Sequence, residues 1–180
     1  MTPRTALDTE GAWFERSHIS QLRRQLPICY VDVIPVRTEV DGSIAEVGLL
    51  LRASGEGQIV RAIVSGRVMV HETLREAISR HVEKDLGPMA MPRIPVSPTP
   101  FTVAEYFPTP GQSAFHDPRQ HAISLVYIVP IDGESAPQED ALELSWYTVD
   151  ELLGANTPLD EMDGGRDALV RRALAHSGLI

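Results

Sequence analysis

The chain has only one cysteine, Cys29, among its 180 residues. No internal disulfide can therefore form, and a chain without disulfides suits the reducing cytoplasm, where we expect the protein to act. Cys29 lies within the apolar run PICYVDVIPV. Because free cysteines are among the most frequently buried residues, this run favours a buried structural thiol over a catalytic nucleophile.

Long apolar runs and positive charge are also scarce. No segment approaches the roughly 18 apolar residues of a membrane span, and the N-terminal segment MTPRTALDTE lacks the apolar core of a signal peptide. The 16 Lys and Arg residues stand against 25 Asp and Glu, a formal net charge of -9. This balance argues against general binding to nucleic acid or to anionic membranes, because both are polyanions. A small ligand is the partner that we expect.

The remaining composition is typical of a globular domain. Hydrophobic residues make up 43% and charged residues 23% of the chain, which is close to the average for globular proteins. A chain of this length buries roughly 70% of the surface that it exposes when unfolded, so one core is sufficient. We expect a single domain over residues 1–180, with residues 1–12 as a flexible tail.

The hydrophobic pattern predicts an α/β protein with a mixed order of strands and helices. Asp41-Gly42 is a strong turn signal between two β-rich runs, which should therefore pair antiparallel. Strands are expected over residues 28–36, 44–52, 58–64, 101–107, 121–131 and 142–148. Helices are expected over residues 12–26, 72–86, 149–153 and 165–178.

The helix expected at residues 72–86 has one continuous apolar stripe. Its members recur at the spacing of about 3.6 residues that places side chains on one helix face, and Gly87-Pro88 ends the pattern. They are Leu74, Ala77, Ile78, Val82 and Leu86. The stripe predicts a helix that packs on the sheet.

The segment SGRVMVHETLREAISRHVEKDLGP, residues 65–88, resembles the signature of the Nudix hydrolases. That signature is Gly, five residues, Glu, seven residues, Arg-Glu, an aliphatic residue, any residue, Glu-Glu, any residue and Gly. The frame residues in register without gaps are Gly66, Glu72, Arg80, Val82 and Gly87. Asp85 takes the second place of the terminal acidic pair, whereas His81 and Lys84 replace two glutamates.

The resemblance implies an α/β/α sandwich around a mixed β-sheet, a homodimer and a bound Mg²⁺. It is greatest to the GDP-mannose mannosyl hydrolase branch, which also lacks the Glu after the arginine. In that branch an Asp, an Arg and a His assist departure of the nucleotide diphosphate, and the terminal signature acid holds magnesium. The matching residues here are Asp32, Arg52, His121 and Asp85.

The metal site that the resemblance implies is depleted in this chain. At 100° per residue, His81, Lys84 and Asp85 share one side of the helix, and Glu83 lies on the other side, so it cannot replace a missing acid. The remaining candidate ligands are Asp85, His81 and a backbone carbonyl at Ser65 or Gly66. Lys84 would repel a dication and could instead contact a substrate phosphate. We therefore expect Mg²⁺ to be weakly bound or absent.

Several charged residues also have plain structural interpretations. Glu72, Glu76 and Arg80 can form a solvent-facing ladder of ion pairs. Asp32 can pair with Arg52 across the sheet, either as a structural ion pair or as part of the site, because an isolated buried carboxylate is costly.

Two further stretches carry candidate site residues. The run FHDPRQH holds His116, Asp117, Arg119 and His121, which form either a polar loop or a phosphate or metal site, with Arg119 as the candidate substrate contact. In the GDP-mannose branch that the chain resembles, the general base comes from a loop before the last strand. Gln138, Glu139 or Asp140 could serve here, although none is in a matching register.

Two functions are compatible with these features. The first is a divergent Nudix-type hydrolase acting on a nucleoside diphosphate linked to a sugar or similar group. The second is a Nudix-fold module without catalysis that binds a phosphorylated metabolite or a protein partner.

Overall fold

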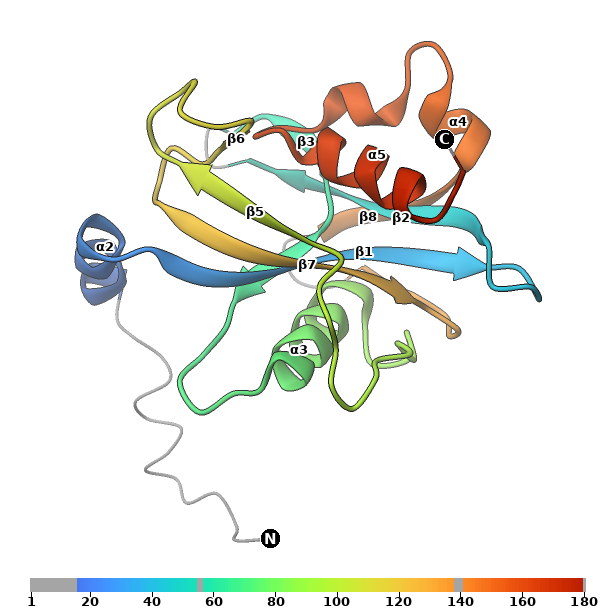
Figure 1. Cartoon of the computed structure of the whole chain (residues 1–180), viewed down its shortest axis with the longest axis horizontal. Coiled ribbons are helices and arrows are strands. Elements are labelled where there is room, and N and C mark those ends of the chain that lie inside the picture. Colours follow the sequence, from blue (N-terminus) through green and yellow to red (C-terminus); the bar gives the residue numbers. More distant parts are fainter. Residues whose placement is uncertain (1–15, 55–56, 138–140, 180) are drawn as a thin grey trace, which may run out of the picture.

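The computed structural model describes residues 16–54, 57–137 and 141–179 (Figure 1). The expected flexible tail at residues 1–12 lies outside this range, as do the three candidate bases, Gln138, Glu139 and Asp140. Within it, no helix is long and apolar enough to cross a membrane.

The centre of the fold is one mixed sheet of eight strands in the order β3-β2-β1-β7-β5-β6, with β4 on β1 and β8 on β2. β1 runs antiparallel to β2, as the Asp41-Gly42 turn predicted. On its other side β1 runs parallel to β7. The strands are β1 (Ile28–Thr38), β2 (Ile44–Ala53), β3 (Ile59–Ala62), β4 (Val64–Arg67), β5 (Thr102–Phe107), β6 (Phe115–His116), β7 (Ala122–Pro130) and β8 (Ala141–Thr148).

The single strand predicted over residues 58–64 is divided in the structure. β3 pairs with β2, and β4 pairs with β1, so the chain passes from one neighbour to the other at the buried Ile63. The apolar pattern runs through both strands without interruption, which is why periodicity alone did not separate them.

Helices cover both faces of the sheet (Figure 1). One face carries α3 (Leu74–Leu86), and the other carries α5 (Arg166–His176) with α4 (Val149–Leu153) and the 3₁₀ turn η1 (Pro158–Glu161). α2 (Arg16–Gln25) precedes β1. The expected α/β/α sandwich around a mixed sheet is confirmed.

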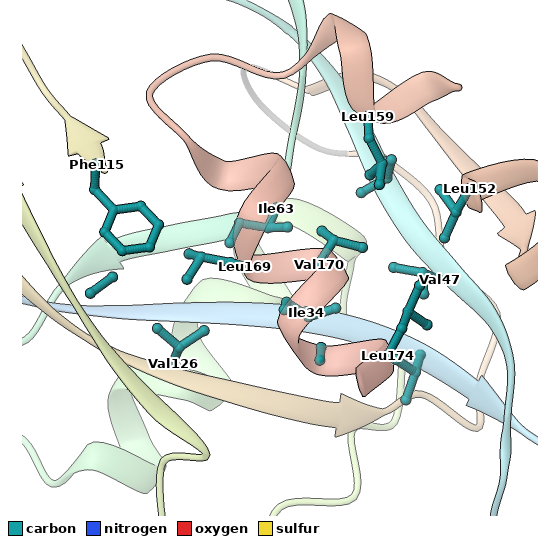
Figure 2. Packing of buried hydrophobic residues seen from close by; sticks show 14 of the residues in the cluster. Ile34, Val47, Ile63, Phe115, Val126, Leu152, Leu159, Leu169, Val170 and Leu174 are labelled. Carbon is teal, nitrogen blue, oxygen red and sulfur yellow. The ribbon is translucent and has the colours of Figure 1, made fainter. Parts of the chain in front are cut away.

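Each face of the sheet has its own core. Ile34 and Val36 of β1 pack with Leu169, Val170 and Leu174 of α5 (Figure 2). Val31 and Val33, from the same strand, pack instead with the apolar stripe of α3. This division follows from the strand geometry, in which successive side chains point to opposite faces.

The signature helix α3 begins and ends where local sequence dictates. Thr73 and Glu76 form a reciprocal capping box at its start. At its end Gly87 has a φ of 90°, a conformation that disfavours other residues, and Pro88 follows. Glu72 therefore lies just before the helix rather than in its first turn.

The prediction for Cys29 is wrong, because its side chain is exposed. Cys29 lies at the start of β1 and shares the strand face of Val31 and Val33, but only the later part of that face is buried. The apolar run indicated a strand correctly, whereas it could not show which end of the strand α3 covers.

Candidate functional site

Three charged side chains meet at the C-terminal end of α3. Asp85 is 1% exposed, and its Oδ2 accepts a hydrogen bond from Nη2 of Arg52 at 3.0 Å. Lys84 Nζ donates to Asp85 Oδ1 at 3.3 Å. Arg52 comes from β2, so this Arg52–Lys84–Asp85 centre joins the sheet to the signature helix. Asp85 therefore contacts two cations, one on each carboxylate oxygen.

His81 is a packed side chain rather than an open ligand. Its Nε2 lies 3.0 Å from the carbonyl oxygen of Arg67, which can only accept, so Nε2 carries the proton. Burial lowers the pKa of His81 below its ordinary 6.5, which favours the neutral ring. Nδ1 then carries a lone pair and no proton, and it is buried without a hydrogen-bond partner among the described residues.

The lowered pKa of His81 predicts a loss of stability in mild acid. Below pH 6.5 the unfolded chain protonates this histidine while the folded chain resists, so the free energy of unfolding falls as the pH falls. The slope is at most about 1.4 kcal/mol per pH unit. Urea unfolding at pH 7.5 and 5.5 should show a smaller loss for His81→Gln than for the wild type. Equal losses would contradict this assignment.

Glu72 and Arg80 form a partly buried link rather than a solvent-facing ladder. Arg80 donates to the Glu72 carboxylate through Nε at 2.6 Å and Nη2 at 2.8 Å, and the Glu72 side chain is only 10% exposed. Burial raises the pKa of Glu72, but hydrogen bonds from Arg80 and the Met69 amide outweigh it and lower the pKa overall. The expected ladder is therefore wrong for Glu72, and the pair anchors the preceding loop to α3.

The donor atoms at this helix do not fit a bound magnesium ion. Each oxygen of Asp85 already faces a cation. The Ser65 hydroxyl is directed to Asp32, so a backbone carbonyl at Ser65 or Gly66 stays only a predicted ligand. Across the ranges that the structure describes, no three His, Cys, Asp or Glu side chains gather as metal ligands would. A hard dication requires several converging oxygens, and here it would lie beside Arg52 and Lys84.

Asp32 belongs to a separate cluster on the opposite face of the sheet. It alternates with Val31 and Val33, so it points toward α5, where it accepts hydrogen bonds from Ser65 Oγ at 2.5 Å and Tyr106 Oη at 2.9 Å. Burial, followed by the Asp32 charge, raises the pKa of Tyr106. The expected pair of Asp32 with Arg52 is therefore wrong: the two side chains are on different faces.

The space around Asp32 is too small for a nucleotide. Tyr106 and Arg166 help to line a cavity of about 10 Å³, which is roughly the space that one water molecule needs. Arg166 lies over the Tyr106 ring at 4.8 Å. Sequence reasoning did not place Tyr106 or Arg166 beside Asp32, although the alternation in β5 puts Tyr106 on the buried face with Ala104.

Arg119 and His121 make their contacts away from the Arg52–Lys84–Asp85 centre. Arg119 donates to both oxygens of Asp117, each at 2.8 Å, and these bonds lower the pKa of Asp117 despite its burial. His121 lies 3.1 Å from Glu105 Oε1 and stacks on Phe107 at 4.5 Å. Neither Arg119 nor His121 bonds to Arg52 or Asp85. The arrangement of Arg119 agrees with the polar-loop interpretation.

Known proteins provide an independent comparison. A family model described as a domain of unknown function (DUF4916) matches residues 9–179. No curated protein sequence matches the chain. A crystal structure from Jonesia denitrificans, described as a possible asymmetric diadenosine tetraphosphate (Ap4A) hydrolase, is 55% identical with a TM-score of 0.82. The match covers 87% of this chain and 98% of that chain.

More distant structures share the fold alone. A NUDIX-family hydrolase from Clostridium perfringens is 16% identical with a TM-score of 0.60, over 86% of this chain and 98% of that one. A bifunctional NMN adenylyltransferase/ADP-ribose pyrophosphatase from Francisella tularensis, complexed with AMP and a Mn ion, is 17% identical with a TM-score of 0.57. That match covers 90% of this chain and 47% of the other, so this chain spans about half of it.

These comparisons support the superfamily that the signature indicated, but they do not single out its GDP-mannose branch. The chain belongs to the DUF4916 family and, through its signature, fold and 55% identical relative, to the Nudix hydrolase superfamily.

Proposed function

We propose that this protein is a divergent Nudix-type hydrolase whose ligand is a nucleoside diphosphate linked to a sugar or similar group. The phosphates would bind at the Arg52–Lys84–Asp85 centre. The observation that supports this most is the contact of Arg52, from the sheet, with the signature acid Asp85. It brings Arg52 to the helix that carries Lys84 and the signature, and cations of this kind are the usual partners of phosphate oxygens.

The Jonesia denitrificans relative supports a ligand with linked phosphates rather than a particular sugar. Diadenosine tetraphosphate, which its description names, places a second nucleoside where a nucleotide sugar has its sugar. We therefore include dinucleoside polyphosphates in the proposed substrate class.

The residue roles within this proposal follow the observed contacts. Arg52 would neutralise charge on the departing diphosphate, and Lys84 would contact a phosphate oxygen. Asp32 would act at a distance, by holding Ser65 and thus β4 in place behind the helix. Direct roles for His121 and Arg119, a base at residues 138–140 and a homodimer stay predictions.

Binding without turnover is the second candidate function. It is favoured by the pairing of Asp85 with two cations, because hydrolysis in this superfamily generally uses divalent metals and the described donor set does not fit one.

One screen distinguishes the two functions. Purified protein is incubated with nucleotide sugars and dinucleoside polyphosphates in Mg²⁺, Mn²⁺ or EDTA, while binding is followed by thermal shift and products by chromatography. We expect at least one compound to stabilise the wild type, and Arg52→Gln to lose that effect. Turnover would establish the hydrolase, and stabilisation without turnover would establish the binding module. No binding and no turnover would contradict both.

A further inference from the structure

We infer that the phosphates bind at the Arg52–Lys84–Asp85 centre without a divalent cation, because Arg52 and Lys84 themselves supply the positive charge. The inference rests on the proposed function, since it concerns the same ligand and the same centre. It differs from that proposal in stating what neutralises the phosphate.

Lys84 is distinctive in the composition of the whole chain. Of the 16 Lys and Arg residues, Lys84 is the only lysine, so the other fifteen are arginines. It occupies the first place of the terminal acidic pair in the signature. A lysine ammonium is a compact point charge with three donors, which resembles a metal ion more closely than a planar guanidinium does. Its side chain is 34% exposed, so an anion can reach it.

Arg52 has donor capacity left after its contact with Asp85. The ion pair uses one N–H group of Nη2, which leaves the other N–H groups of Nη1 and Nη2 for a ligand, whereas Nε is buried. A guanidinium has five N–H donors in a planar fork that suits phosphate oxygens. The side chain is 22% exposed, which leaves part of this fork open to a ligand.

Two other arginines of the candidate site residues and the signature, Arg80 and Arg119, already donate to acids of their own. Arg80 donates to Glu72 and to the Arg67 carbonyl, and Arg119 donates to both oxygens of Asp117. Each of these acids matches one arginine, whereas Asp85 is shared by Arg52 and Lys84. Arg52 and Lys84 therefore meet on one carboxylate at the end of the signature helix.

Asp85 positions the cations rather than recruiting a metal. It is 1% exposed and holds one cation on each oxygen, so a dication would have to displace a partner and accept the repulsion of both. A phosphate needs no such displacement, because it approaches the cations from their exposed side. This division of roles predicts that the affinity for phosphate is independent of Mg²⁺.

Calorimetric titration with inorganic pyrophosphate tests the inference. We expect binding in EDTA and in Mg²⁺ to agree within about threefold, and Lys84→Gln to weaken it by about tenfold or more, as loss of a charge-assisted contact does. Lys84→Arg, which keeps the charge, should retain most of the affinity. Arg75→Gln removes an exposed arginine from the same helix and should change nothing.

The single lysine permits a second, independent measurement. Acylation of Lys84 can be followed by mass spectrometry, with the α-amino group as the internal reference. Pyrophosphate in EDTA should slow acylation of Lys84 and not that of the reference. Binding that needs Mg²⁺, an unweakened Lys84→Gln or unprotected Lys84 would each overturn the inference. In that case, nucleotide binding or turnover in the screen would still uphold the proposed function.

Discussion

Replacing Gly66 with alanine is expected to destabilise the protein by about 3 kcal/mol, the upper part of the range for overpacked cores. The Cβ of that alanine would lie 1.8 Å from Cε1 of His81, far inside van der Waals contact. The His81 ring cannot easily move away, because it is buried between α3 and β4 and its Nε2 donates to the Arg67 carbonyl. The first glycine of the signature is therefore required by the histidine that packs on it.

The double variant Gly66→Ala with His81→Ala separates this contact from other effects of the substitution. Without the ring the new methyl group has room, and alanine in place of glycine restricts the unfolded chain, which is stabilising where the backbone allows it. Chemical denaturation of the four proteins gives the coupling free energy between the two positions. We expect Gly66→Ala to be costly in the wild type and nearly neutral in the His81→Ala background. An equal cost in both would exclude the clash as its cause.

The order of the elements was predictable because it depends on local patterns. The turn at Asp41-Gly42, the change of period at Glu72 and the stop at Gly87-Pro88 each act over a few residues. The structure confirms the hairpin and the signature helix at nearly the expected bounds.

The partners of the charged residues were less predictable, because they depend on which face of the sheet each strand presents. Asp32 and Arg52 looked like a pair in the sequence, but Asp32 faces α5 while Arg52 faces α3. Alternation within a strand fixes the relation between Asp32 and Val33, yet it does not say which helix covers which face. The expected ion pair failed for this reason.

His81 shows the same limit for a single residue. Helical geometry places it on the same side as Asp85, which is consistent with a ligand role. Two features of β4 decide its role. Gly66 has no Cβ, which leaves room for the ring, and the Arg67 carbonyl accepts a hydrogen bond from Nε2. These contacts span 14 residues or more in sequence, so no periodicity in the helix reveals them.

Replacing Lys84 with glutamate is expected to create a divalent-metal site. The change removes a cation from Asp85 and adds a carboxylate beside it, which gives the adjacent pair of acids that the signature normally has. At an effective dielectric of 20, two unit charges about 4 Å apart interact by about 4 kcal/mol, before desolvation and the partial exposure of residue 84 reduce this.

The affinity for Mn²⁺ reports this change directly. Electron paramagnetic resonance of free Mn²⁺ should show at least about tenfold tighter binding to Lys84→Glu than to Lys84→Gln, which corresponds to about 1.4 kcal/mol. Lys84→Gln is the matched control, because it removes the cation without adding an acid. The melting temperature of Lys84→Glu alone should rise with Mn²⁺, since a ligand that binds only the folded state stabilises it. If the two variants bind Mn²⁺ equally, Arg52 and the buried position of Asp85, rather than Lys84, are what exclude the metal.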